Sequence, residues 1–187
     1  MVQAGDFYAV CVTPLFYDAH VKDSIHRYKF QNARGYRHTY APLVAACIEE
    51  HLNAQYDLIS WPPVSKKRLR QRGYDQAELL AKEVAPYLDK LCVSTLKKSR
   101  HVAAQSSVGG REKRRANIAG AYIVPDKALV AGKRILLIDD VLTTGSTLSE
   151  SARTLLLAGA DEVVCATIAR ATVREREALE EKVLVTV

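Results

Sequence analysis

The chain has 187 residues, of which 48% are hydrophobic and 26% are charged, and its formal net charge is +6. These values predict one α/β-sized domain with enough chain for a buried core. No segment has the length of a membrane span. The first residues carry an early Asp6 and no basic run before Phe7–Phe16, so we expect no signal peptide there.

The four cysteines predict a reducing compartment. Cys11, Cys47, Cys92 and Cys165 lie far apart in apolar surroundings. A disulfide framework or a zinc site would need cysteines that are closer together in the sequence. We therefore expect buried free thiols, a cytoplasmic protein, and no bound metal until a substrate brings Mg²⁺.

Hydrophobic patterns alternate between strands and helices along the chain. Strands are predicted at Phe7–Tyr17, Asp57–Trp61, Cys92–Leu96, Ile118–Val124, Ile135–Ile138 and Glu162–Ala169. Helices are predicted at His20–Asn32, Tyr40–Ala54, Asp75–Leu88 (with Asp75 as its N-cap) and Leu148–Leu157. This order predicts an α/β fold: a Rossmann-like parallel sheet flanked by helices and wound by right-handed crossovers. We expect a single domain over residues 1–187, with its core at about 17–171 and a charged C-terminal tail at 172–187.

The segment Ile135–Thr147 is the most informative one. Its four aliphatic residues predict a strand buried on both faces, and the carboxylates of Asp139 and Asp140 follow where this strand should end. A small-residue turn then leads into a helix, and it consists of Thr143, Thr144, Gly145, Ser146 and Thr147. Such a turn suits phosphate, because free backbone N–H groups and the helix dipole both favour an anion.

The two acids cannot contact that phosphate without repulsion. They are expected to hold sugar hydroxyls, or an Mg²⁺ that bridges to phosphate oxygens. Phosphate, polyol and divalent metal together indicate a sugar phosphate. Rival motifs are excluded, since no Gly-Lys-Ser/Thr follows a spaced glycine and the pair Gly109-Gly110 lies in a basic stretch.

These thirteen residues resemble the phosphoribosyl-pyrophosphate (PRPP) signature of type I phosphoribosyltransferases: a hydrophobic strand, two acids, two hydrophobic residues and Thr-Thr-Gly-x-Thr. Other blocks resemble the ComF/GntX family, which is known from competence proteins. They are Tyr28-Lys29-Phe30, Pro63-Val64-Ser65, Arg72-Gly73-Tyr74-Asp75-Gln76, Gln105 and Arg114-x-x-Asn117-x-x-Gly120-Ala121-Tyr122. The resemblance runs from about Tyr17 to Arg170 and implies the type I phosphoribosyltransferase fold.

The sequence departs from this family at a few places. Family members commonly begin with a cysteine-rich zinc ribbon, whereas this sequence has no Cys-x-x-Cys, so we expect that the ribbon was lost or trimmed. Asp75 stands where Asn is usual, Trp61-Pro62 replaces Pro-Val, and Val102 lies near a customary Thr. These changes affect the expected recognition of the acceptor more than that of PRPP.

The resemblance also implies roles for individual residues. Thr143–Thr147 would hold the 5-phosphate, and Asp139 and Asp140 would take the ribose hydroxyls directly or through Mg²⁺. The pyrophosphate loop maps onto Pro62–Lys67, which includes Pro63, Val64, Ser65, Lys66 and Lys67. The lid that excludes water in this fold maps onto Lys97–Arg115. Candidates to meet the leaving pyrophosphate there are Arg100, Arg111 and Arg114.

Two basic clusters contain 12 of the 27 Lys and Arg residues. The first consists of Lys66, Lys67, Arg68, Arg70 and Arg72, and the second of Lys97, Lys98, Arg100, Arg111, Lys113, Arg114 and Arg115. Such clusters attract a polyanion, either pyrophosphate or a nucleic-acid backbone. Alternative interpretations stay open: the first cluster as the solvated start of a helix, and the second as a nucleic-acid arm.

Two functions are therefore expected. The first is an enzyme that transfers phosphoribose from PRPP, with Mg²⁺, to an undefined nucleophile and releases pyrophosphate. The second is a non-catalytic, competence-type PRPP-binding protein that handles single-stranded DNA. The clusters offer only Tyr74 as a nearby aromatic residue for base stacking, which favours the enzyme. A homodimer is left open.

Overall fold

The computed structural model describes residues 2–3, 6–53, 56–99 and 120–171. Within these residues the main sheet has the strand order β1-β2-β9-β8-β4-β5, with β3 also paired to β9. The strands are β1 (Val2–Gln3), β2 (Cys11–Val12), β3 (Leu15–Phe16), β4 (Leu58–Ser60), β5 (Leu91–Cys92), β8 (Arg134–Leu142) and β9 (Glu162–Arg170). Only the β1–β2 pair among these is antiparallel. The predicted parallel sheet is confirmed.

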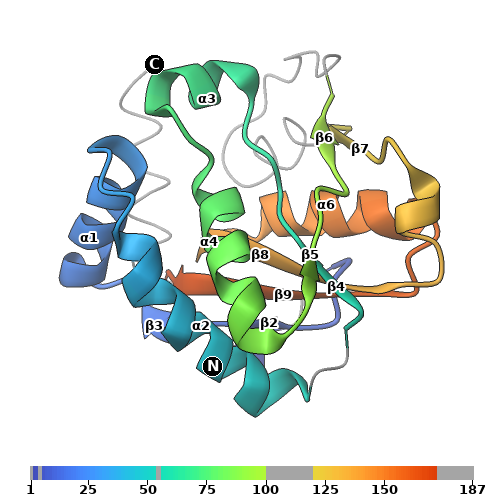
Figure 1. Cartoon of the computed structure of the whole chain (residues 1–187), viewed down its shortest axis with the longest axis horizontal. Coiled ribbons are helices and arrows are strands. Elements are labelled where there is room, and N and C mark those ends of the chain that lie inside the picture. The colour runs from blue at the N-terminus through green and yellow to red at the C-terminus, as the bar shows by residue number, and fades with distance from the viewer. Residues whose placement is uncertain (1, 4–5, 54–55, 100–119, 172–187) are drawn as a thin grey trace.

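Helices cover both faces of this sheet (Figure 1). α2 (Tyr36–Leu52) and α4 (Gln76–Val84) pack on one face, and α6 (Ser146–Leu157) packs on the other. α1 (Ala19–Phe30) lies on the left of Figure 1, beside the edge at which β8 and β9 end. Short elements complete the described part: α3 (Lys66–Arg72), η1 (Ala85–Leu88), η2 (Lys127–Leu129) and the antiparallel pair β6 (Lys97–Lys98) and β7 (Tyr122–Ile123).

Strand β8 is central because both of its faces are buried. Leu136 and Ile138 pack with α2 and α4, whereas Ile135 and Leu137 pack with α6. Each fully buried aliphatic side chain of this kind contributes about 1.5–3 kcal/mol to stability. The aliphatic run therefore folds as predicted, as a strand in the interior of a parallel sheet.

The end of β8 differs from the prediction. The strand continues through Asp139 and Asp140 to Leu142, because its pairing with β9 runs on to Leu142 and Arg170. The two acids thus belong to the strand rather than to the turn after it. Their side chains are consequently fixed by the regular alternation of a strand.

Other boundaries moved for local reasons. The predicted strand at Phe7–Tyr17 forms only the short strands β2 and β3, with Pro14, which has no N–H for a sheet ladder, between them. The helix at Tyr40 begins earlier, at Tyr36, and the strand at Cys92–Leu96 is limited to β5.

The first basic cluster folds as a helix. Lys66 and Lys67 begin helix α3, and the Ser65 hydroxyl caps it by accepting the Arg68 N–H at 3.3 Å. The C-terminal tail and the first residues of the strand predicted at Ile118–Val124 lie outside the described residues. In the part of the chain that the structure describes, no helix is both long and apolar enough to cross a membrane.

Candidate functional site

The two acids of β8 lie at the edge of the sheet where its parallel strands end. Neighbouring residues of a strand point to opposite faces. Asp140 faces the side of α1, where its Oδ1 is 2.8 Å from the Nζ of Lys29. Asp139 faces the opposite side, where its charge acts on Tyr122 of β7 and on Lys98 of β6. A ligand lying across this edge can therefore be contacted by both carboxylates.

The two carboxylates differ electrostatically. Burial, and next the charge of Asp140, raise the pKa of Asp139 well above its usual value. The Asp140 N–H donates to Asp139 Oδ1 at 2.8 Å, which offsets only part of this cost. Positive charge brought to Asp139 would be favourable for the same reason.

The chemistry of this pair fits Mg²⁺. Among the described residues, no group of three or more His, Cys, Asp or Glu side chains could hold a metal ion. Mg²⁺ needs no such group, because it prefers oxygen ligands and is commonly held by one or two carboxylates together with substrate phosphates and water. Two adjacent acids at this edge of the sheet therefore suit a metal that arrives with a substrate.

The turn after β8 has the form of an anion-binding site. Gly145 is the N-cap residue of α6 and has φ +74°, a conformation that favours glycine. A Cβ on Gly145 would lie 2.9 Å from the hydroxyl oxygen of Tyr8, so a close approach also requires glycine here. Glycine offers no side chain to cap α6, and the Ser146 N–H donates to the Thr144 hydroxyl at 3.4 Å, so the other backbone N–H groups of the first helical turn are left for an anion.

Two sequence blocks meet at the end of α1. The hydroxyl of Tyr28 donates to the backbone oxygen of Gln76 at 2.8 Å, and the hydroxyl of Tyr74 donates to the backbone oxygen of Tyr28. The side chain of Gln76 donates in turn to the backbone oxygen of Lys29 at 3.4 Å and accepts from Arg72 at 2.8 Å. The block Arg72-Gly73-Tyr74-Asp75-Gln76 thus holds Tyr28-Lys29-Phe30, and with it the lysine that pairs with Asp140.

Asp75 fixes the loop after β4. Its Oδ1 accepts the N–H groups of Ala77 and Glu78 at 3.1 and 3.2 Å, so it caps α4 as predicted. Its Oδ2 accepts the N–H of Val64 at 2.8 Å, a bond that the sequence did not reveal. Burial raises the pKa of Asp75 despite these donors. The carboxylate therefore joins the predicted pyrophosphate loop to the helix that follows it.

A basic cavity of about 1320 Å³ lies between α3 and the β6–β7 pair. Its lining includes five described lysines and two acids, and Lys82 is paired with Glu78 at 2.6 Å: Lys66, Lys67, Lys82, Lys97, Lys98, Asp75 and Glu78. Lys98 is half-buried, with its Nζ 4.0 Å from the ring centroid of Tyr122. Burial, and next the charge of Arg68, lower the pKa of Lys98 to about 8. An anion in this cavity would favour the charged lysine.

The structure brings most of the predicted residues to one end of the sheet. Asp139, Asp140 and Thr143–Thr147 lie along β8 and the start of α6. Pro63–Ser65 lie between β4 and α3, and Lys66 and Lys67 begin α3. Arg100, Arg111 and Arg114 of the predicted lid lie outside the described residues. Lys29 and Tyr8 were not predicted as site residues, although Tyr28-Lys29-Phe30 had been recognised as a family block. Lys98 had been predicted only as part of the lid and of the second basic cluster.

Sequence comparison places these features in a known family. The family described as the phosphoribosyl transferase domain matches residues 75–186. Competence protein F of Haemophilus influenzae is 31% identical over 153 residues, which cover 79% of this chain and 66% of that protein. Competence protein ComFC of Streptococcus pneumoniae is 30% identical over 148 residues, which cover 79% of this chain and 62% of that protein. The chain thus spans slightly less than two thirds of each of these relatives.

Among solved structures, the adenine phosphoribosyltransferase of Thermoanaerobacter pseudethanolicus is similar with a TM-score of 0.46 and 16% sequence identity. The similarity covers 76% of this chain and 84% of that one. The chain belongs to the phosphoribosyl transferase domain family, as the signature on β8 predicted. Within that family it is a ComF-type, phosphoribosyltransferase-like protein, as its other sequence blocks predicted.

Proposed function

We propose that this protein binds PRPP with Mg²⁺ and transfers the phosphoribosyl group to a nucleophile, releasing pyrophosphate. One observation carries the proposal: β8 brings two carboxylates to the end of the sheet, directly before a glycine-led turn at the N-terminus of α6. Acids that suit sugar hydroxyls and a turn that suits phosphate then follow each other at the end of one strand, the combination that a ribose phosphate needs.

In this function the chain's own groups bind and orient PRPP. The N–H groups and hydroxyls of Thr143–Thr147 would hold the 5-phosphate, and Asp139 and Asp140 would hold the ribose hydroxyls. The Mg²⁺ held by the same acids and by substrate oxygens would withdraw charge from the leaving pyrophosphate. As the nucleophile bonds to C1, the C1–O bond to pyrophosphate breaks and its electron pair leaves with pyrophosphate. A proton on the nucleophile passes to solvent.

Thermal unfolding with ligands tests PRPP binding. At 100 times Kd, a ligand that binds only the folded state stabilises it by about 2.7 kcal/mol. For a domain of this size, this corresponds to a rise in Tm of roughly 5–10 °C. We expect this rise with PRPP and Mg²⁺ and little change with ATP and Mg²⁺. An unchanged Tm at saturating PRPP and Mg²⁺ would contradict the proposal.

Amide variants separate binding from folding. Asp139→Asn and Asp140→Asn keep the shape of each side chain and remove its charge, so we expect PRPP affinity to fall by roughly tenfold or more. Asp57→Asn is the matched control, because Asp57 accepts the Arg134 N–H at the opposite end of β8. Titration with PRPP and a denaturant midpoint are measured for each variant. Unchanged affinity with a lowered midpoint would show that the two acids serve only the fold.

A second function is favoured by the basic cavity between α3 and β6. Its five lysines suit a nucleic-acid backbone as well as pyrophosphate, and Trp61 and Ile123 supply apolar surface in the same cavity. Two relatives carry the name of competence proteins. The alternative proposal is therefore a PRPP-binding, competence-type protein that handles single-stranded DNA without catalysis.

A further inference from the structure

Lys29 is a cation that the chain itself supplies to the acids of β8. Its Nζ lies 2.8 Å from Asp140 Oδ1, and the Lys29 and Asp140 side chains are only 20% and 15% exposed. Burial and the charge of Asp140 raise the pKa of Asp139, and the charge of Lys29 partly offsets them. One ammonium group therefore acts on both carboxylates of the proposed PRPP site.

The backbone around Lys29 is fixed by hydrogen bonds from the second sequence block. The hydroxyl of Tyr74 donates to the backbone oxygen of Tyr28, and the side chain of Gln76 donates to the backbone oxygen of Lys29 at 3.4 Å. A side chain that starts from a fixed backbone loses less conformational entropy when it forms an ion pair. These bonds therefore favour the pairing of Lys29 with Asp140.

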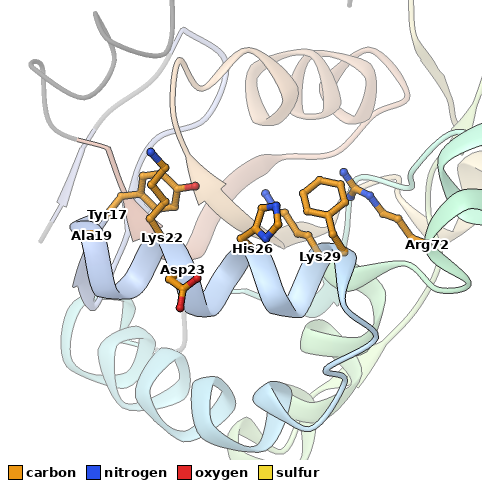
Figure 2. A pocket seen from close by; sticks show the side chains of 8 residues that line it. Tyr17, Ala19, Lys22, Asp23, His26, Lys29 and Arg72 are labelled. Carbon is orange, nitrogen blue, oxygen red and sulfur yellow. The ribbon is translucent and has the colours of Figure 1, made fainter. Parts of the chain in front are cut away.

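The space beside Lys29 is unfavourable for a displaced ammonium group. Lys29 lines a cavity of about 360 Å³ along α1, and Lys22 and Arg72 line the same cavity. Figure 2 shows Lys22 and Lys29 on the same side of α1, with Arg72 reaching toward them from the neighbouring helix. Asp23, an acid that also lines the cavity, points away from the three cations in Figure 2. Repulsion between like charges therefore keeps the Lys29 ammonium in its ion pair.

Mg²⁺ and the Lys29 ammonium compete for the carboxylate of Asp140. Mg²⁺ binds oxygen ligands at about 2.0–2.1 Å, and its charge repels an ammonium group on the same carboxylate. A tethered group acts at an effective concentration on the order of millimolar or more, so free Mg²⁺ at similar concentrations has little advantage over it. Mg²⁺ that arrives with PRPP differs, because the negative phosphates stabilise the released ammonium. The ion pair therefore opposes Mg²⁺ alone more than Mg²⁺ with PRPP.

We propose that Lys29 is a resident counter-ion that Mg²⁺ replaces on Asp140, and that it couples the binding of the metal to the binding of PRPP. This inference rests on the proposed function, because the metal is the one that accompanies PRPP there. In the protein alone, Lys29 neutralises Asp140 and hinders the binding of free Mg²⁺. When Mg²⁺ and PRPP bind together, the ammonium group leaves Asp140 for anionic oxygens of PRPP and for water.

The first test measures Mg²⁺ affinity by calorimetry in the absence of PRPP. Lys29→Met removes the competing charge, so we expect Mg²⁺ to bind roughly tenfold more tightly than to the wild type, which is about the effect of one charge-assisted contact. Lys29→Arg retains a cation and should bind Mg²⁺ as weakly as the wild type. Lys22→Met is the matched control, because Lys22 is exposed on the same side of α1 and the variant removes the same charge.

The second test measures the coupling between Mg²⁺ and PRPP. The factor by which saturating Mg²⁺ raises PRPP affinity equals the factor by which PRPP raises Mg²⁺ affinity. Because Lys29→Met binds Mg²⁺ without PRPP, we expect this factor to be roughly tenfold smaller than in the wild type. Chelation of Mg²⁺ by PRPP in solution is the same for every variant and cancels in the comparison.

The possible results separate the inference from the proposed function. If PRPP with Mg²⁺ binds the wild type but Lys29→Met has an unchanged Mg²⁺ affinity, the counter-ion role is wrong and the proposed function stands. If PRPP with Mg²⁺ does not bind the wild type, the proposed function fails, and the coupling fails with it. An equal gain of Mg²⁺ affinity in Lys22→Met would show an effect of net charge and would also overturn the inference.

Denaturant midpoints check the fold of each variant. A lowered midpoint of Lys29→Met together with an unchanged Mg²⁺ affinity would show that Lys29 serves only the fold. Lys29→Gln, which can still donate a hydrogen bond to Asp140 but has no charge, replaces Lys29→Met if that variant does not fold. The same gain of Mg²⁺ affinity is then expected.

Discussion

A single strand places two adjacent carboxylates in different electrostatic surroundings. Lys29 pairs with Asp140 on one face of the sheet, whereas burial and the neighbouring charge of Asp140 oppose ionisation of Asp139 on the other. The difference arises from the two-residue period of a strand, since consecutive side chains cannot share a face. A bound cation would therefore stabilise the ionised form of Asp139 more than that of Asp140, because Asp140 is already paired with Lys29.

Lys98 has an unusual environment for a lysine. Its Nζ lies over the ring of Tyr122 on β7, and the charges that act on it are Arg68 of α3, Asp139 of β8 and Glu150 of α6. Burial and Arg68 prevail over the two acids, so the pKa of Lys98 falls to about 8. The side chain can therefore gain or lose its charge within the range of ordinary buffers.

We predict that Lys98 makes pyrophosphate binding dependent on pH. An anion beside it stabilises the charged form, so affinity is enhanced below the free-protein pKa of about 8 and the enhancement is lost as the pH rises through it. Lys98→Met measures the background, including the titration of pyrophosphate itself. The ratio of wild-type to Lys98→Met affinity should fall from roughly tenfold at pH 7 toward one at pH 10. A ratio that is constant with pH would remove Lys98 from the anion site.

Elements far apart in the sequence are joined at the site by hydrogen bonds between sequence blocks. Tyr28, Tyr74 and Gln76 connect the end of α1 to the start of α4, and Asp75 connects α4 to the loop after β4. These bonds give a physical reason for the presence of both blocks in one chain. Each holds a loop or a lysine that faces the proposed PRPP site.

The sequence predicted those parts of the fold that depend on local pattern. The aliphatic run before Asp139 predicted the buried strand β8, and Asp75 was predicted as the N-cap of α4. Both predictions succeed because hydrophobic periodicity and helix capping depend on only a few neighbouring residues. The pairing of Lys29 with Asp140 joins positions more than a hundred residues apart, so no local pattern reveals it. No local pattern reveals the close approach of the Tyr8 hydroxyl to Gly145 or the hydrogen bond from the Val64 N–H to Asp75.

We predict that Asp75→Ala destabilises the fold more than the loss of an ordinary cap. A lost N-cap costs about 0.5–2 kcal/mol, and the partly buried bond from the Val64 N–H to Asp75 adds about 1 kcal/mol. Asp18→Ala is the control, because Asp18 is exposed and caps α1 through the Val21 N–H, at 2.8 Å. Denaturant unfolding of both variants gives the comparison. Equal destabilisation would mean that the second oxygen of Asp75 contributes little.

In the part of the chain that the structure describes, several lysines gather in one cavity near the end of the sheet. α3 and β6 bring lysines from two distant segments to one cavity, beside the acids and turn of β8. Concentrated charge of one sign raises the local concentration of polyanions and is sensitive to salt. Pyrophosphate and single-stranded DNA are both attracted by such a field, so charge alone does not separate the enzyme from the DNA-handling protein.

The salt dependence of DNA binding distinguishes the enzyme from the DNA-handling protein. Each DNA phosphate neutralised by the protein lowers the slope of log K against log salt by a little under one, so contacts within this cavity predict a slope of roughly −2 to −4 for single-stranded DNA. Reversing Lys66 and Lys67 to Glu should remove about two of these contacts. Reversing Lys127 and Lys133, which are exposed and lie away from this cavity, changes the net charge equally and serves as the control. If both pairs weaken DNA equally, the attraction reflects net charge alone. If no DNA binds even at low salt, the cavity serves pyrophosphate and the competence-type alternative is wrong.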